Sequence, residues 1–149
     1  MNIKITGTGS CLPDNVVTNF DMAKIVETSD EWIRERTGIA ERRISTGETV
    51  ASLAAEACER ALEMAGKSAS EVDLIIVGTC SPELLLPCAA CQVQASIGAD
   101  KAVAFDLSAA CSGFLFALNT AYSYIAAGIY KNALIVGSEV LSKLMDWSD

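Results

Sequence analysis

The stretch Asp106-Leu107-Ser108-Ala109-Ala110-Cys111-Ser112-Gly113-Phe114-Leu115-Phe116 decides how the rest of this chain is interpreted. Its first two residues are the end of an apolar run from Ala102 to Leu107, which is typical of a strand. Its last residues begin a series of apolar residues that recur at helical spacing as far as Ile125. The pattern therefore places Cys111 at the point where a strand turns into a helix.

A cysteine at such a turn is suited to act as a nucleophile. The first turn of a helix has backbone N–H groups without intrahelical partners, and the helix dipole lowers the pKa of a thiol held nearby. Small neighbours such as Ala110 and Gly113 let the backbone bend and let a substrate approach the sulfur. The alternative is a buried cysteine that packs as a small hydrophobic residue, and the local pattern favours neither interpretation.

Strands and helices alternate along the whole chain. Apolar strands are predicted at 3–9, 73–78, 102–107 and 132–137. Helices are predicted at 19–26, at 50–65, at 88–97, from Cys111 to Gly128, and from a capping box at Thr28 and Glu31 to near Gly38. Continuous apolar strands separated by helices indicate a mostly parallel sheet covered on both faces, which is an α/β domain.

Composition excludes several classes of protein. The 149 residues suffice for about one domain, and 51% of them are hydrophobic. No apolar run is long enough to span a bilayer, and the first residues lack the basic region and long apolar core of a signal peptide. We therefore expect a cytoplasmic protein without membrane contact. The net charge of −8, without a basic cluster, argues against nucleic acid as a partner.

The cysteines fit a reducing compartment. All six lie in apolar segments of a chain without an export signal. Cys88-x-x-Cys91 is a lone pair, and the chain has no histidine, so we expect no metal site.

Trp32 and Arg36 are four residues apart and share one face of a predicted helix. A flat indole and a forked guanidinium on one face can hold an aromatic base and a phosphate. A surface tryptophan shielded by an arginine through a cation–π contact is the alternative, and the spacing alone favours it.

Several sequence blocks together resemble one enzyme family. In order along the chain they are Ile5–Pro13, Thr28–Ile33, Arg36–Ile39 with Glu41–Arg43, Pro87–Gln92, Phe105–Phe114 and Val136–Glu139. With this spacing they are similar to the N-terminal half of β-ketoacyl-acyl carrier protein synthase III.

The resemblance implies a thiolase-like fold, in which two duplicated halves form a layered α/β/α/β/α architecture. Residues 1–149 would be the N-terminal half that carries the nucleophile, with the C-terminal half absent from this chain. Cys111 would accept the acyl group of an acyl-CoA as a thioester. Malonyl-acyl carrier protein would then be decarboxylated, and its carbanion would attack that thioester, which initiates a fatty-acid chain. Acyl-CoA is a substrate here, so no cofactor is expected, and a homodimer is implied.

The resemblance also assigns binding residues. Trp32 would stack on the coenzyme A adenine with Arg36 opposite it, while Thr28 and Thr37 line the same site. This reverses the preference that spacing alone gave for Trp32. The backbone N–H of Cys111 would contribute to an oxyanion hole.

Three further positions resemble acyl-pocket residues: Cys80, Leu86 and Leu141. Some relatives carry a phenylalanine at the position of Leu86 that reaches across the dimer interface. Because leucine is smaller, we expect room for acyl groups longer than acetyl or branched.

One part of the family's machinery is missing from this sequence. The synthases use a histidine and an asparagine from the C-terminal half, which would have to come from a partner. Two alternatives stay open: another thiolase-fold condensing enzyme of polyketide or quinolone type, and a non-catalytic subunit paired with an active one. A redox-sensing role for Cys111 is weaker, because no resolving cysteine lies near it in sequence.

Overall fold

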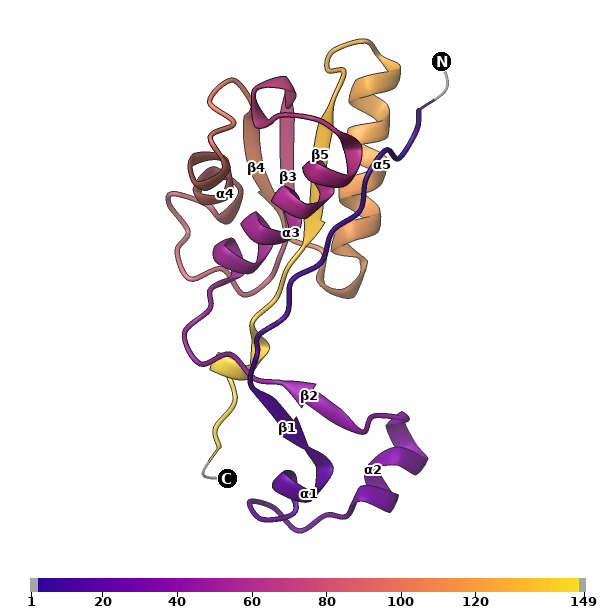
Figure 1. The fold of residues 1–149 in the computed structure, drawn as a ribbon, viewed down its shortest axis with the longest axis vertical. Coiled ribbons are helices and arrows are strands. Elements are labelled where there is room, and N and C mark those ends of the chain that lie inside the picture. The colour runs from indigo at the N-terminus through magenta and orange to yellow at the C-terminus, as the bar shows by residue number, and fades with distance from the viewer. Residues whose placement is uncertain (1–2, 148–149) are drawn as a thin grey trace. The chain divides into compact units, whose positions relative to one another are not determined.

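The structure is a computed structural model that describes residues 3–147, and the chain divides into two compact units (Figure 1). The first unit consists of Met1–Cys11 and Thr49–Glu139, and the second of Leu12–Glu48 and Val140–Asp149. Among the described residues, no helix combines the length and the apolar character that a membrane span requires.

A parallel sheet forms the centre of the first unit. Its order is β4-β3-β5, with β3 at Leu74–Gly78, β4 at Val103–Leu107 and β5 at Ala133–Gly137. Leu74 of β3 is in register with Val103 on one side and Ala133 on the other. Every residue of β3 is buried, as expected for the central strand of a sheet covered on both faces. The three strands predicted from residues 73, 102 and 132 are confirmed.

Helices cover both faces of this sheet (Figure 1). The helices α3 (Val50–Ala65) and α4 (Ala89–Ile97) pack together on one face, and α5 (Gly113–Ala126) packs on the other. Leu74 and Ile76 of β3 form a core cluster with two alanines of α5, Ala117 and Ala121. Small side chains on α5 let the helix lie close to the strands. The predicted α/β class is confirmed.

The outer side of α5 remains apolar. Phe114, Leu115, Phe116 and Tyr122 of this helix are exposed. An exposed apolar face of this kind commonly marks a surface that another protein segment covers.

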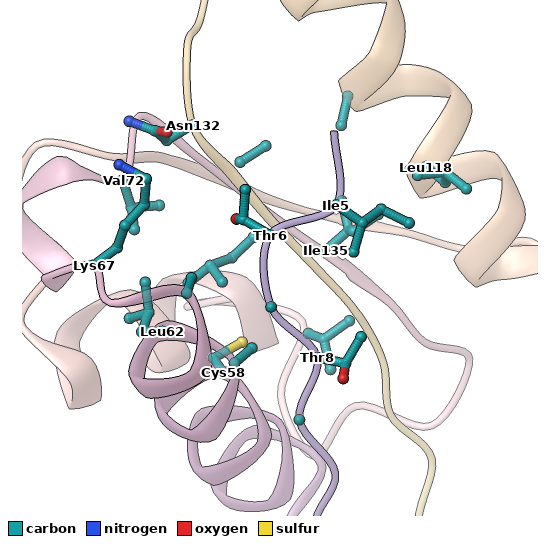
Figure 2. A pocket seen from close by; sticks show the side chains of 18 of the residues that line it. Ile5, Thr6, Thr8, Cys58, Leu62, Lys67, Val72, Leu118, Asn132 and Ile135 are labelled. Atoms are coloured by element: carbon teal, nitrogen blue, oxygen red, sulfur yellow. The ribbon is translucent and has the colours of Figure 1, made fainter. Parts of the chain in front are cut away.

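The N-terminal segment corrects a prediction. Residues 3–9 were predicted as a strand, but they form an extended segment outside the sheet. The reason lies in two glycines, because a Cβ on Gly7 or Gly9 would overlap the backbone carbonyl oxygen of Ala61 or Ala57 in α3. The segment is therefore held against the helix. A cavity of about 500 Å³ lies between it and α3, α5 and β5, with Ile5, Thr6 and Cys58 among its lining residues (Figure 2).

The second unit is built on a short antiparallel strand pair. β1 (Val16–Thr18) pairs with β2 (Glu41–Arg43), and between them lie α1 (Asn19–Met22) and α2 (Asp30–Thr37). The strand pair was not predicted, and the helix predicted at 19–26 is too long. The N–H groups of Ile25 and Val26 both donate to the Met22 carbonyl, which closes a turn and ends α1.

The start of α2 lies one residue later than predicted. Ser29 is the N-cap, and its hydroxyl accepts the Trp32 N–H at 3.1 Å, so the capping box expected at Thr28 is wrong. The helix ends at Gly38, whose φ of 72° is in the left-handed region, and this end was predicted correctly.

Candidate active site

Cys111 lies between a strand and a helix, as predicted. It is exposed in a 3₁₀ turn at Ala110–Ser112, which follows β4 and leads directly into α5. Ala110 has a φ of 48° and is the one non-glycine residue among positions 3–147 with a positive φ. The backbone therefore bends sharply just before the sulfur, and no side chain in the described part of the chain caps the N-terminus of α5.

The end of the central strand supports this turn. A Cβ added to Gly78, the last residue of β3, would lie 2.9 Å from the carbonyl carbon of Gly113 and 3.1 Å from the Phe114 nitrogen. The start of α5 therefore rests directly on β3 at a place where no side chain fits. This contact therefore sets how close the Cys111 turn lies to the carboxyl ends of the strands.

Cys80 bonds to the same turn. The N–H of Ala110 donates to Cys80 Sγ at 3.2 Å, and that sulfur lies 3.4 Å from Ser108 Oγ. The family resemblance implied a pocket-lining role for Cys80. Its contacts show that it holds the residue that precedes Cys111.

Glu139 ties together the segments that follow β3 and β5. Its carboxylate accepts the Cys80 N–H at 2.7 Å and the Thr79 hydroxyl at 3.3 Å, and it also accepts the Ser81 hydroxyl. Sequence reasoning gave Glu139 no role. The signal that was available is an acidic side chain two residues after the apolar strand 132–137, at the edge of the sheet where the carboxyl ends of parallel strands lie.

Asp106 connects β4 to the start of α4. Its two carboxylate oxygens accept the N–H groups of Ala89 and Ala90 at 2.9 and 2.7 Å. Carboxylates are favoured at helix N-termini because they satisfy backbone donors and oppose the helix dipole.

The other predicted acyl-pocket residues lie in different parts of the chain. Leu86 belongs to the segment between β3 and α4 and is 86% exposed. Leu141 begins a 3₁₀ turn in the second unit and is also exposed.

Trp32 and Arg36 share one face of α2, as predicted. The guanidinium carbon of Arg36 lies 4.3 Å from the centroid of the Trp32 ring, and the ring is half exposed. This is the cation–π contact that the spacing favoured. An adenine stacked between the two side chains would have to displace the guanidinium from the ring.

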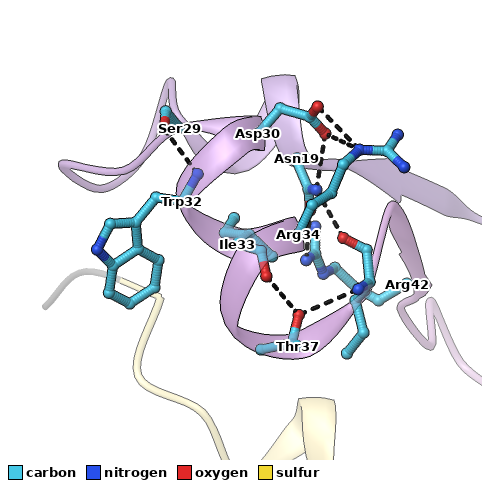
Figure 3. A network of polar contacts seen from close by, with 9 residues as sticks. Asn19, Ser29, Asp30, Trp32, Ile33, Arg34, Thr37 and Arg42 are labelled. Atoms are coloured by element: carbon cyan, nitrogen blue, oxygen red, sulfur yellow. Dashed lines mark hydrogen bonds and ion pairs between the residues drawn. The ribbon is translucent and has the colours of Figure 1, made fainter.

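The two threonines predicted in this site differ in their bonding. Thr37 Oγ1 donates to the Ile33 carbonyl at 2.7 Å and accepts the Ile39 N–H at 3.1 Å, so it closes the end of α2 (Figure 3). Within residues 3–147, the buried hydroxyl oxygen of Thr28 has no hydrogen-bond partner.

A buried asparagine orients α2 within its unit (Figure 3). Asn19 Nδ2 donates to Asp30 Oδ1 and to the Ile39 carbonyl, both at 2.8 Å, and Asn19 Oδ1 accepts from Arg42 at 2.8 Å. The hydrogen bond from Asn19, followed by that from Arg34, lowers the pKa of Asp30. Sequence reasoning missed this network, because its members lie far apart in the chain.

In the part of the chain that the structure describes, no three His, Cys, Asp or Glu side chains are grouped to hold a metal ion.

A parallel sheet between two helical layers, with an exposed cysteine at a strand-to-helix turn, defines half of a thiolase-like α/β fold. The solved structure of 3-oxoacyl-[acyl-carrier-protein] synthase III from Aquifex aeolicus VF5 confirms this class. It matches with a TM-score of 0.95 and 53% identity, over 98% of this chain and 47% of that one.

Sequence comparison gives the particular family. Residues 105–149 match the family model described as 3-Oxoacyl-[acyl-carrier-protein (ACP)] synthase III. The chain is 57% identical over 148 residues to Beta-ketoacyl-[acyl-carrier-protein] synthase III of Clostridium acetobutylicum, covering 99% of this chain and 46% of that relative. It is 53% identical over 150 residues to Beta-ketoacyl-[acyl-carrier-protein] synthase III 1 of Bacillus cereus, covering 100% and 48%.

The resemblance seen in the sequence is thereby confirmed. The chain corresponds to the N-terminal portion of a β-ketoacyl-acyl carrier protein synthase III, and it spans about half the length of the curated relatives it matches.

Proposed function

We propose that this chain carries the acyl-accepting centre of a 3-oxoacyl synthase. Cys111 Sγ attacks the carbonyl carbon of an acyl-CoA thioester, and the coenzyme A thiolate leaves from the tetrahedral intermediate. The acyl group is then held as a thioester on Cys111. The backbone N–H of Cys111 stabilises the oxyanion that forms during the transfer.

One observation carries this proposal. Cys111 is exposed at the start of α5, where no side chain of the described residues caps the helix and the first-turn backbone N–H groups have no intrahelical partners. Four features support the turn that presents it: Gly78, Cys80, Ser108 and the positive φ of Ala110. Strained backbone next to a reactive group is a recurrent feature of active sites.

The second reaction uses malonyl-acyl carrier protein. Loss of CO₂ leaves an enolate that attacks the acyl thioester, releases the Cys111 thiolate and forms 3-oxoacyl-acyl carrier protein. A histidine and an asparagine from a C-terminal half stabilise the enolate, and this chain has no histidine. In this proposal residues 1–149 form the N-terminal half, the enzyme is a cytoplasmic homodimer, and the second half covers the exposed face of α5.

Trp32 and Arg36 hold the adenine and phosphates of coenzyme A in this proposal, together with Thr28 and Thr37. The support is the common face of Trp32 and Arg36 on α2 and the Thr28 hydroxyl, which has no hydrogen-bond partner among the described residues. Cys80, Leu86 and Leu141 line the acyl pocket.

A priming synthase of polyketide assembly is the second candidate. It is favoured by similarity to the solved structure of the Priming beta-Ketosynthase from the R1128 Polyketide Biosynthetic Pathway. That structure matches with a TM-score of 0.94 and 36% identity, over 98% of this chain and 44% of that one.

The test measures 3-oxoacyl-acyl carrier protein after the chain is co-expressed with the C-terminal portion of a synthase. The expected result is product from acyl-CoA and malonyl-acyl carrier protein, and none from the Cys111→Ala variant. Equal product from both proteins would contradict the proposal. Product formed only with a polyketide-type carrier protein would favour the second candidate.

A further inference from the structure

A pair of thiols outside the proposed active site lies at the start of α4. Cys88 is the N-cap of this helix, and Cys91 is its third residue. The Cys88 thiol donates to Cys91 Sγ at 3.5 Å, and the Cys91 thiol lies 3.8 Å from the Ala104 carbonyl oxygen of β4. Both side chains are half-buried, so small molecules in solution have access to them.

The geometry of this pair suits a disulfide. A disulfide bond is about 2.05 Å long, so the two sulfurs must approach by roughly 1.5 Å from their 3.5 Å separation. Rotation of the Cys88 side chain can supply this movement, because Cys88 makes no capping hydrogen bond. Asp106 caps the helix instead, through the N–H groups of Ala89 and Ala90.

The surroundings of Cys88 and Cys91 favour slow thiol–disulfide exchange. The contact with Cys88, followed by burial and the nearby charges of Cys88 and Asp106, raises the pKa of the Cys91 thiol. A raised pKa keeps this thiol protonated at neutral pH and lowers its reactivity. The pair therefore differs from the Cys-x-x-Cys sites of disulfide oxidoreductases, where a lowered pKa supports fast turnover.

We propose that Cys88 and Cys91 form a reversible modification site that closes to a disulfide by exchange with a low-molecular-weight disulfide such as oxidised glutathione. The Cys88 sulfur, as its thiolate, attacks one sulfur of the small disulfide R–S–S–R and displaces one thiolate. The Cys91 sulfur then attacks Cys88 Sγ, forms the intramolecular bond and displaces the second thiolate. The two protein thiols are oxidised, the small disulfide is reduced to two thiols, and these take up both protons.

Neither thiol takes part in the acyl transfer proposed for Cys111. The pair lies at the end of the segment that carries Leu86, which the proposed function places at the acyl pocket. In a reducing compartment the pair remains a dithiol, and an excess of small disulfide closes it.

The test uses the Cys111→Ser variant, because this substitution removes the competing Cys111 thiol. The variant is exposed to oxidised glutathione. Intact mass should fall by two hydrogen atoms. Trypsin releases Cys80, Cys88 and Cys91 in one peptide, 68–101, which contains no internal lysine or arginine. Fragmentation of this peptide should assign the bond to Cys88 and Cys91. A bond that includes Cys80, a stable glutathione adduct on Cys88, or an unchanged mass would overturn the proposal.

Two further measurements guard against misfolded variants. Phenylarsine oxide bridges closely spaced thiols, so in the Cys111→Ser background it should bind one equivalent. Additional replacement of Cys88 or Cys91 by serine should abolish that binding. In the same background, the closure rate with oxidised glutathione should rise from pH 7 to pH 8, because the thiolate and not the thiol is the attacking species in thiol–disulfide exchange. A rate independent of pH, or arsenical binding that survives both replacements, would overturn the proposal.

Discussion

Replacing Gly78 by alanine tests whether the end of β3 positions the nucleophile. The new Cβ would lie 2.9 Å from the Gly113 carbonyl carbon, whereas carbon atoms in van der Waals contact are about 3.5–4.0 Å apart. The start of α5 must therefore move away from the strand by roughly 0.6–1.1 Å. Because the obstructing atoms belong to the backbone, no side-chain rotation relieves the overlap.

This displacement has two measurable effects. Overpacking of this kind costs about 1–3 kcal/mol of stability. For a protein of this size the melting temperature falls by about 2–4 °C for each kcal/mol. A displacement of about 1 Å in a reacting group lowers rates by about 100-fold, so acylation of Cys111 should slow by up to that factor.

The assay follows acylation of Cys111 by rapid-quench mass spectrometry and unfolding by calorimetry, on the chain co-expressed with a C-terminal half. Gly47→Ala is the matched control, because an added Cβ there meets no atom within 4 Å. It should acylate normally and melt at the same or a slightly higher temperature. A Gly78→Ala protein with the acylation rate and the melting temperature of the unmodified chain would refute the positioning argument.

Three further predictions concern the candidate site. Iodoacetamide at pH 8 should label the exposed Cys111 much faster than Cys58, because burial raises the pKa of the Cys58 thiol to about 12; peptide mapping that finds equal labelling would contradict this. Trp32→Ala should remove a stacking surface worth about 1–3 kcal/mol and weaken coenzyme A binding about five- to hundredfold. Arg36→Lys should also weaken it, because a point charge does not replace a planar fork, and calorimetry that shows unchanged affinity in both variants would return Trp32 to a packing role. Leu86→Phe should shift kcat/KM toward acetyl-CoA, whereas the unmodified chain should favour butyryl-CoA by roughly 0.8 kcal/mol for each buried methylene; a preference for acetyl-CoA before the substitution would contradict the pocket assignment.

The parts of the fold with a strong local signal were predicted correctly. Leu74–Gly78 is a central strand buried on both faces, and such strands are continuous apolar runs. The helix Val50–Ala65 shows its buried side as a regular apolar pattern and ends at Gly66 in the left-handed region. The position of Cys111 between a strand and a helix was predicted because the apolar residues before it form a continuous run and those after it recur at helical spacing.

The features that local patterns missed depend on contacts between distant residues. The segment with Gly7 and Gly9 has the composition of a strand, but those glycines let it lie on the backbone of α3. Asn19 is buried by a network that reaches Arg42, and Cys80 bonds to Ala110, thirty residues away. No periodicity of hydrophobic residues encodes such hydrogen bonds, so only the folded structure reveals them.

The most direct test of the acyl-accepting role is the mass of the tryptic peptide 102–131, whose only cysteine is Cys111. The co-expressed protein is incubated with acyl-CoA in the absence of malonyl-acyl carrier protein, quenched in acid and digested. We expect this peptide to gain the mass of one acyl group, hydroxylamine to remove it, and the Cys111→Ser peptide to gain no hydroxylamine-sensitive acyl group. An unmodified Cys111 peptide after prolonged incubation, or acylation confined to another cysteine, would contradict the acyl-accepting role of Cys111.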